Sequence, residues 1–399
     1  MSSSPATRPG PWLRLTALAA AAATLVAVVS GTVGPTTAHS LLSALALPPL
    51  AALAVAAWVA HRRLLPATAV ALAFFAAAAA VTVPGVHAAL AALAFAAALV
   101  LCVQVFRAHG ARVPREAWRD YVTLTKPRIM TLLLLTGGAG AFVGAQGAPP
   151  LGTFVAAMAG LALACGGASA LNHVLDADID RLMGKRTEKR PVAAGRVAPS
   201  RGLEFGLALS ALSFVLLAST VNALTAALAL VGNLFYVLVY TRWLKRSTHQ
   251  NIVIGGAAGA VPPLVGYAAA SGSLALPALW LFLIVFLWTP PHFWALALLI
   301  KENYAAARVP MLPVVRGDDE TTRQIVLYSL VMVGFTLAVG LSLGPLYSAA
   351  ALVLGGAFLW LARELRRRPT RRNAAVLFHY SLVYLALLFV AAAIDPLVL

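Results

Sequence analysis

An amide and two carboxylates at the end of an apolar stretch are the residues of this chain best suited to chemistry. Asn172, Asp176 and Asp180 lie at the end of the apolar run 151–175, in a sequence with only 13 Asp and Glu. On a helix, a spacing of four residues drifts by only about 40° per step, so the three side chains share one face. Oxygen ligands of this kind suit Mg²⁺, which proteins usually hold through one or two carboxylates together with substrate phosphates. The spacing therefore predicts a magnesium site formed by Asn172, Asp176 and Asp180.

Basic residues close to this site predict that the metal is accompanied by an anion. On a continuous helix Asp178 would point about 200° away from Asp176, so it joins the cluster only if the helix unwinds there. The alternative is a solvated charged loop, which is common at helix ends. Metal ligands beside cations favour a diphosphate site, and the cations expected to bind the anion are Lys126, Arg128, Arg181, Lys185, Arg186, Lys189 and Arg190.

A second polar segment, 240–246, ends in two cations and is followed by Asn251. Lys245 and Arg246 would neutralise a diphosphate leaving group and therefore count as catalytic candidates. The alternative is ordinary anchoring of a membrane helix by basic and aromatic residues at its inner end. Asn251 and the glycine pair 255–256 favour a closely packed helix entrance, or room for a bulky planar ligand.

A third segment places a histidine inside an apolar run. Pro290 and Pro291 should kink the helix and free carbonyl groups, which membranes tolerate only where protein or a cavity satisfies them. His292 follows directly and is a candidate for substrate binding, because ionisable groups within membrane helices are usually functional. A hydrogen-bonded core histidine is the alternative. Glu302 and Tyr304, just beyond this run, are further substrate-binding candidates.

The composition indicates that membrane helices position these residues. Of the 399 residues, 61% are hydrophobic and 11% charged, whereas soluble domains have about 25% charged residues. Apolar runs of about 20 residues predict transmembrane helices, because only a helix satisfies its own backbone in lipid. We expect an all-α, polytopic fold with about thirteen spans: 12–33, 41–60, 64–83, 86–106, 128–146, 151–175, 203–220, 222–240, 251–270, 277–300, 325–343, 346–361 and 375–394.

The distribution of basic residues predicts the orientation of these spans. All 30 Lys and Arg fall into alternate segments, and the intervening loops have none. Basic loops stay inside, so the N-terminus is expected inside and the C-terminus outside. The net charge of +17 is then explained by orientation and by an anionic inner leaflet, and no nucleic-acid partner is expected. A cleaved signal peptide is the alternative for 12–33, although this run is long for one.

The chain divides into two regions, and only the second contains residues that indicate a function. Residues 1–110 are expected to form four Ala-rich helices of unknown role, and residues 111–399 a nine-helix domain that contains every candidate site residue. Histidines near the ends of the first four helices fit the membrane interface better than they fit paired haem ligands; these are His39, His61, His87 and His109.

Six motifs give the chain a resemblance to a known family over residues of about 120–395. They are Leu-Thr-Lys-Pro-Arg128, Asn172-x3-Asp176-x-Asp178-x-Asp180, Tyr240-Thr-x-x-Leu-Lys-Arg246, Asn251-Ile-Val-Ile-Gly-Gly256, Pro291-His-Phe-Trp-Ala-Leu-Ala297 and Val309-Pro-Met-Leu-Pro-Val314. Together these motifs resemble the intramembrane aromatic prenyltransferase superfamily, and within it most closely the protohaem IX farnesyltransferase (haem O synthase) family.

The resemblance implies a reaction. Mg²⁺ held by Asn172, Asp176 and Asp180 would bind farnesyl diphosphate, and nearby cations would help its allylic C–O bond to ionise. A vinyl group of haem b would capture the farnesyl cation, and water would complete haem O. The family usually has Asp-Asp-Tyr where this chain has Glu302-Asn303-Tyr304, which puts a second metal contact in doubt. The four N-terminal helices look like half of a haem A synthase, which is therefore a candidate partner.

Other functions stay open at this stage. The same site would serve a different acceptor, such as a quinone precursor or chlorophyllide. A secondary transporter is a further alternative, with His292 and a broken helix forming its substrate site. The basic loops and the absence of an Arg-rich transit peptide favour a bacterial plasma (inner) membrane, with the active site facing the cytoplasm.

Overall fold

A computed structural model describes residues 11–32, 46–59, 64–80, several residues between 93 and 104, and 117–398. In these parts of the chain the regular elements are helices, and the expected all-α class is confirmed. The fourth predicted span, the domain boundary near residue 110 and the four N-terminal histidines lie largely or wholly outside the described residues.

Nine helices of the described part are long and apolar enough to cross a membrane. They correspond one to one with the nine spans predicted for residues 111–399. Their bounds are α7 (Pro127–Ala145), α8 (Leu151–Leu175), α11 (Pro199–Thr220), α12 with its continuation through η2 and α13 (Ala223–Ser247), α14 (Asn251–Ser271), α15 (Leu276–Leu299), α17 (Leu312–Gly340), α18 (Pro345–Arg367) and α19 (Arg371–Val398).

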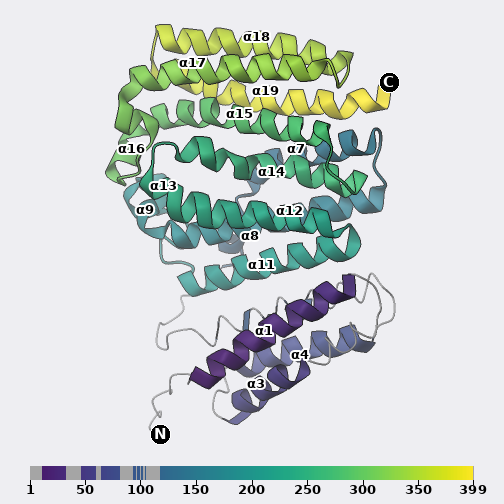
Figure 1. Cartoon of the computed structure of the whole chain (residues 1–399). Helices are drawn as coiled ribbons and strands as arrows, with labels where there is room; N and C mark the ends of the chain where they lie inside the picture. The colour runs from purple at the N-terminus through teal and green to yellow at the C-terminus, as the bar shows by residue number, and fades with distance from the viewer. Residues whose placement is uncertain are drawn as a thin grey trace.

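These helices lie side by side in one bundle, with α17 and α18 at one edge and α8 and α11 towards the other (Figure 1). The centre is formed by α7 and α14, which approach to backbone contact. A Cβ added at Gly266 would lie 1.7 Å from the carbonyl oxygen of Gly137, and one at Gly140 would lie 2.2 Å from that of Pro263. Small residues are typical where membrane helices approach this closely.

Several helices extend beyond the spans that hydrophobicity predicts. The largest difference is at α17, which begins at Leu312 rather than near residue 325 and changes direction at Gly317, where φ is +79°. Similarly, α18 continues to Arg367, and α19 begins at Arg371. Apolarity marks only the lipid-facing length of a helix, whereas hydrogen bonding carries the helix on into the polar region beyond it.

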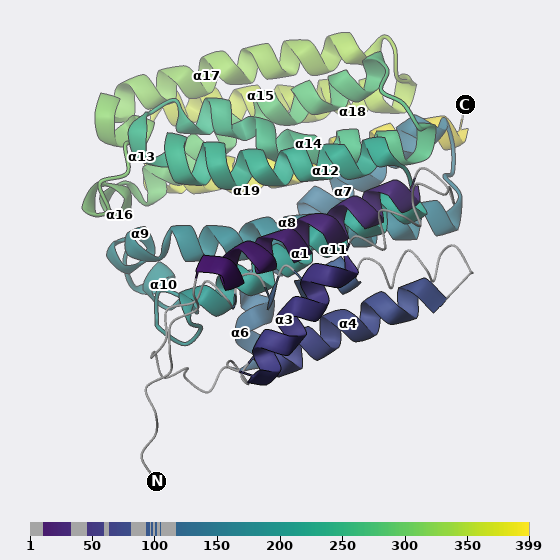
Figure 2. The same ribbon diagram turned by 60° about the horizontal axis from the view of Figure 1, so that its bottom comes forward.

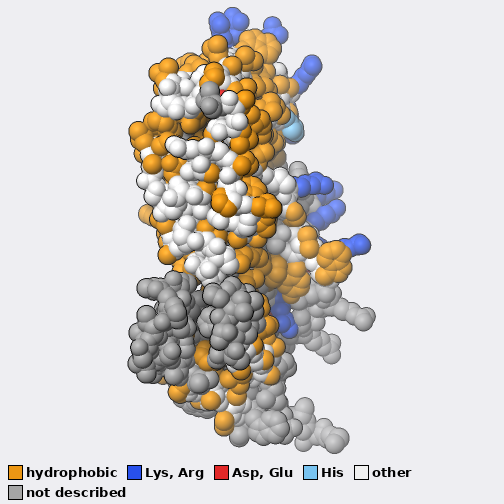
Figure 3. Space-filling view, turned by 90° about the vertical axis from the view of Figure 1, so that its right-hand side faces the viewer, with side chains coloured by type: hydrophobic (Ala, Val, Ile, Leu, Met, Phe, Trp, Pro, Cys, Tyr) orange, Lys and Arg blue, Asp and Glu red, His pale blue; other side chains and the backbone are white. Residues whose placement is uncertain are grey.

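Short helices gather at one end of the bundle, where the polar connections lie (Figures 1 and 2). They are α6 (Trp118–Leu124), α9 (Ala177–Leu182), α10 (Lys185–Glu188) and α16 (Lys301–Ala306). The opposite end carries the C-terminus. Seen from that end, the described surface is mostly hydrophobic or uncharged, and the visible Lys and Arg lie at its edge (Figure 3).

The N-terminal region contributes α1 (Pro11–Thr32), α3 (Leu47–Val59) and α4 (Leu65–Ala80). Its described core is small and apolar and includes Leu13, Leu50 and Leu53. Helix α1 lies against α11 of the nine-helix bundle, as both ribbon views show. No candidate site residue comes from this region.

Candidate functional site

The predicted ligands meet where α8 ends. The helix stops at Leu175, Asp176 leaves the helical conformation with φ −96° and ψ 6°, and α9 begins at Ala177. The Asp180 amide nevertheless donates to the Asp176 carbonyl at 2.8 Å, which preserves the helical register across the break. Asp176 and Asp180 are both 0% exposed and Asn172 is 3% exposed. The structure therefore brings the three side chains together in a buried position.

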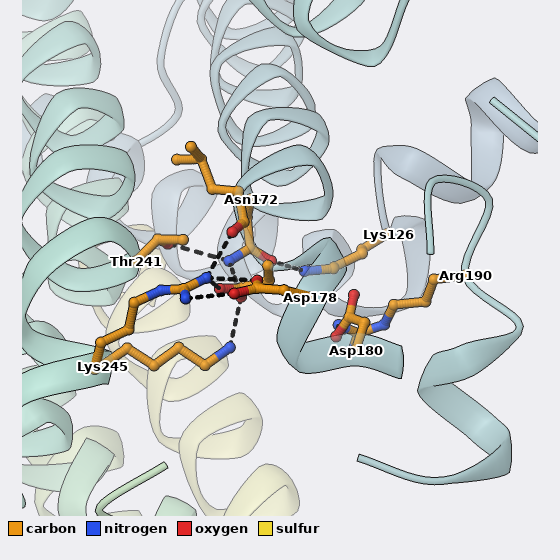
Figure 4. Close-up of polar contacts among 10 residues, drawn as sticks. Lys126, Asn172, Asp178, Asp180, Arg190, Thr241 and Lys245 are labelled. Carbon is orange, nitrogen blue, oxygen red and sulfur yellow. Dashed lines mark hydrogen bonds and ion pairs between the residues drawn. The ribbon is translucent and has the colours of Figure 1, made fainter. Parts of the chain in front are cut away.

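The Asn172 amide connects three elements. Its oxygen accepts a hydrogen bond from Lys126 Nζ at 2.7 Å. Its nitrogen donates to Asp176 Oδ2 at 2.7 Å and to Thr241 Oγ1 of η2 (Phe235–Leu244) at 3.1 Å. These contacts are drawn in Figure 4. Because every polar atom of the amide is used, Asn172 holds Asp176 in a fixed orientation.

Two consecutive cations from the next polar segment reach the carboxylates of this cluster. Lys245 Nζ lies 2.5 Å from Asp176 Oδ2. Arg246 donates to both oxygens of Asp178 at 2.7 Å and lies 3.8 Å from Asp176 Oδ1. The hydrogen bonds from Arg246 lower the pKa of Asp178 to about 2. Asp178, whose side chain is 63% exposed, thus reaches the cluster through Arg246 and does not enter it.

Asp180 is paired from the other side of the cluster. Arg190 Nη1, which lies beyond α10, donates to Asp180 Oδ1 at 2.6 Å. Figure 4 shows this pair beside the Asn172 group, on the side away from Lys245. Burial raises the pKa of Asp180, and Arg190 opposes this effect only in part. Cations from separate loops therefore hold the two buried carboxylates from opposite sides.

Lys126 is held in place by an unusual backbone. It has φ +50° and ψ +60°, the left-handed region that non-glycine residues rarely adopt, directly before Pro127. Burial lowers the pKa of its ammonium to about 7, and Arg190 and Lys245 add to this effect. Three cations that converge on two buried carboxylates repel one another, and a polyanionic ligand would relieve this repulsion.

The buried carboxylates also have unused oxygen atoms. Asp176 Oδ1 and Asp180 Oδ2 are buried and have no hydrogen-bond partner among the described residues. Buried oxygens without partners are costly and call for an explanation such as an ion. Two carboxylate oxygens are few for a cation held by protein alone, but they are what Mg²⁺ needs when phosphates and water complete its shell. The donor set therefore fits a magnesium–diphosphate complex.

The structure gives less support to the other residues predicted to bind substrate. Arg128 and Glu302 are exposed and make no described contact with the cluster. The side chain of Arg186 lies outside the described part. Tyr304 packs in an apolar group with Ile179 of α9, and its burial raises the pKa of the phenol to about 12. Binding roles for these residues remain predictions.

Asn251 and His292 are both buried. Asn251 is 0% exposed and its Oδ1 has no partner in the described chain. His292 is 6% exposed and lies within α15, which continues through Pro290 and Pro291. Its Nδ1 is 2.6 Å from Ser381 Oγ of α19. Both side chains face the interior of the bundle and not lipid.

Three residues at the site were not predicted to take part in it. Thr241 supports Asn172, as described above. His173 is 2% exposed, and neither ring nitrogen has a hydrogen-bond partner among the described residues. Asn303 donates to the Met183 carbonyl at 2.6 Å, linking α16 to the chain after α9. The position next to Asn172 was the available signal for His173. Thr241 and Asn303 stand in the motifs quoted above, but nothing in those motifs indicates which partners they contact.

Comparison with known families places the bundle among membrane prenyltransferases. The UbiA prenyltransferase family matches residues 133–389. A protoheme IX farnesyltransferase of Symbiobacterium thermophilum is 54% identical over 283 residues, which cover 69% of this chain and 94% of that protein. One of Synechocystis is 50% identical over 303 residues, covering 75% and 95%. One of Thermus thermophilus is 52% identical over 280 residues, covering 70% and 46%.

Solved structures agree on the fold. A digeranylgeranylglyceryl phosphate synthase superposes with a TM-score of 0.60 at 17% identity, over 70% of this chain and 99% of that one. A UbiA homologue from Archaeoglobus fulgidus bound to DMAPP and Mg²⁺ gives a TM-score of 0.56 at 17% identity, over 69% and 99%. At these identities the likeness establishes the helical architecture alone.

Proposed function

Because the chain belongs to the UbiA prenyltransferase family, we propose that it transfers the farnesyl group of farnesyl diphosphate to a vinyl group of haem b, giving haem O and diphosphate. Relatives named protoheme IX farnesyltransferase, at about 50% identity along nearly their whole length, support this substrate pair. The observation that carries the proposal is the pair of fully buried carboxylates, Asp176 and Asp180; each has one oxygen that accepts no hydrogen bond from the described residues and a cation on its other oxygen.

The carboxylates would hold the metal of the substrate complex. Asp176 Oδ1 and Asp180 Oδ2 would ligate Mg²⁺. The Asn172 oxygen, which accepts from Lys126 in this structure, would join the ligand set as Lys126 turns to the diphosphate. Bound there, Mg²⁺ would neutralise the diphosphate and make it a better leaving group. The Mg²⁺ and DMAPP bound to the Archaeoglobus fulgidus homologue support a metal-dependent transfer.

The surrounding cations would stabilise the leaving group. As the allylic C–O bond breaks, its electron pair stays on the diphosphate, where negative charge develops. Lys126, Arg190 and Lys245 are already directed at the buried cluster, so they need little reorganisation to bind that charge. Arg246 would contribute from the Asp178 side. Substrate phosphates would thus replace the carboxylates as partners of these cations.

The acceptor needs no general base before the allylic C–O bond of farnesyl diphosphate ionises. The terminal carbon of the vinyl group attacks the farnesyl cation and forms the new C–C bond, which leaves positive charge on the carbon attached to the porphyrin. Water adds there and loses a proton, so that one water is consumed and one diphosphate released. Buried apolar side chains near the site would keep water away from the first cation until the C–C bond forms.

We also propose that the site faces the cytoplasm of a bacterial plasma membrane. The site lies at the end of the bundle where the short helices and basic loops gather (Figure 1), and basic loops are retained inside. Accessibility of single cysteines, introduced at exposed positions such as Asp319 and at Gly272 near the opposite end, to a membrane-impermeant thiol reagent in intact cells would test this orientation.

The function is tested with purified protein in nanodiscs supplied with haem b, farnesyl diphosphate and Mg²⁺. Mass spectrometry should detect haem that has gained a farnesyl group plus water, with release of one diphosphate. Asp176→Asn should lose this activity. The matched control is Asp319→Asn, because Asp319 is an exposed carboxylate paired with Arg366 at the same end of the bundle.

Each result has a separate meaning. Diphosphate release with unchanged haem would support the diphosphate site and refute haem as the acceptor. A quinone precursor or chlorophyllide would then be the acceptor to test. No reaction in a folded, metal-loaded sample would refute prenyl transfer altogether. Equal activity of Asp176→Asn and Asp319→Asn would refute the metal assignment.

A further inference from the structure

His292 is held as one defined tautomer. The Ser381 hydroxyl donates its single hydrogen to the Phe378 carbonyl at 2.7 Å. We therefore assign the hydrogen of the 2.6 Å contact between Ser381 Oγ and His292 Nδ1 to Nδ1, with the serine oxygen accepting. The other ring nitrogen, Nε2, is then left with its lone pair, and it has no hydrogen-bond partner within the described part of the chain.

The orientation of the ring is fixed as firmly as its tautomer. Trp288 stacks on the imidazole with centroids 4.2 Å apart and planes inclined by 18°, and Phe378 stacks at 4.8 Å and 25°. The Trp288 indole N–H donates to the Ser381 carbonyl at 2.8 Å. One residue of α19 thus receives hydrogen bonds from both the imidazole and the indole. A structural histidine needs only a partner, whereas this one is also aligned by aromatic rings.

The arrangement is that of an imidazole prepared for a metal. Histidine ligands usually donate their second ring N–H to an oxygen acceptor, which fixes the tautomer and the ring orientation and raises the basicity of the ligating nitrogen. Here Ser381 is that acceptor and Nε2 is the unused nitrogen. No described cluster of His, Cys, Asp or Glu could supply further protein ligands. The metal must therefore bring its other ligands with it, as the iron of haem does.

The position of His292 suits a porphyrin that is to react at the diphosphate site. It lies seven residues before the end of α15, or about 10 Å from that end. The next residue, Phe293, packs against the apolar group that contains Ile179 and Met183. Ile179 precedes Asp180 directly and Met183 follows it by three residues, so α15 packs against the segment that carries Asp180.

From this geometry we infer that His292 Nε2 is the axial ligand to the iron of the haem substrate, with Ser381 as its positioning residue. The inference rests on the proposed function, since it takes haem b as the acceptor. Coordination holds the centre of the porphyrin at a fixed depth in the bundle, and the vinyl groups then lie at a defined distance from the iron.

The test measures haem binding without farnesyl diphosphate. Full-length protein in nanodiscs is titrated with ferric haem b, and the Soret band and the electron paramagnetic resonance spectrum report the iron ligands. Ser381→Ala should weaken haem binding by about 10- to 100-fold while retaining the imidazole-ligated spectrum, and His292→Ala should weaken binding further and remove that spectrum. The matched control, His379→Ala, should behave as wild type. His379 is also on α19 and is exposed; it hydrogen-bonds only to the Ala375 carbonyl among the described residues, and its ring meets Phe378 edge-on at 5.1 Å.

Metal-free protoporphyrin IX separates coordination from packing and also shows whether the variant is folded. Its binding, measured by quenching of protein fluorescence, should be equal in wild type and His292→Ala. Added imidazole should restore the haem spectrum in His292→Gly. A parallel loss of haem and protoporphyrin binding, or an unchanged haem spectrum in His292→Ala, would overturn the inference.

Wild-type protein labelled with ¹⁵N-histidine gives a result that needs no variant. Its bound haem should show altered nitrogen hyperfine couplings, and unaltered couplings would also overturn the inference. If wild type makes haem O without histidine ligation, only this inference fails. If wild type releases diphosphate but neither binds nor modifies haem, the proposed function fails instead.

Discussion

Replacing Lys245 with methionine should slow the reaction far more than it weakens substrate binding. The Lys245 side chain is 12% exposed and its ammonium lies 2.5 Å from Asp176 Oδ2, at the position from which it would meet the diphosphate. Methionine preserves much of the length and apolar character of the side chain and removes only the charge and its hydrogen bonds. The change therefore tests the electrostatic role without leaving a large cavity.

The magnitude follows from the position of the charge. A unit charge about 4 Å from the developing negative charge is worth about 4 kcal/mol at an effective dielectric constant of about 20. Each 1.36 kcal/mol corresponds to about tenfold in rate, so the upper limit is about a thousandfold. Part of this electrostatic stabilisation is offset, because Lys245 must break its ion pair with Asp176 to meet the substrate. A decrease in kcat of about 100- to 1,000-fold is expected, which matches the range for removing one charge-stabilising donor.

The assay is single-turnover formation of farnesylated haem at saturating substrates, with KM for each substrate determined separately. Lys301→Met is the matched control, because Lys301 is a partly exposed cation paired with Asp318 near the same end of the bundle. It should retain kcat within about twofold. A Lys245→Met enzyme with kcat within fivefold of wild type, or one whose loss lies wholly in the KM for haem, would refute the reasoning.

Gly266→Ala should destabilise the fold by about 1–3 kcal/mol, because its Cβ would lie 1.7 Å from the Gly137 carbonyl oxygen, whereas Gly259→Ala meets nothing within 4 Å. Thermal unfolding in detergent compares the two, and equal Tm values would contradict the α7–α14 packing. Asp395→Ala should cost about 1 kcal/mol, since this buried carboxylate accepts the Leu346 and Tyr347 amides at the start of α18, at 3.1 and 2.8 Å; an unchanged Tm would argue against this cap. Chelation with EDTA should stop diphosphate release and added Mg²⁺ should restore it, and release that continues after complete chelation would argue against the metal site.

The helical bundle could be predicted because its signals are local. Apolar runs and the placement of basic residues identified nine spans between residues 117 and 398, all of which the structure contains. The spacing of Asn172, Asp176 and Asp180 is likewise a property of a single helix. What hydrophobicity could not show was where a helix continues past the lipid, so the first turns of α17 were missed.

Only tertiary structure decided how the site is assembled, because its contacts join residues far apart in sequence. Lys126 reaches Asn172 across 46 positions, and Lys245 reaches Asp176 across 69. Packing also separates cations that the sequence does not distinguish: Lys126 is half-buried and bonds to Asn172, whereas Arg128, two residues on, is exposed. The serine that orients His292 lies 89 positions away. Residue types and helical spacing determined which chemistry the chain can do, and side-chain packing between helices determined which of those residues meet.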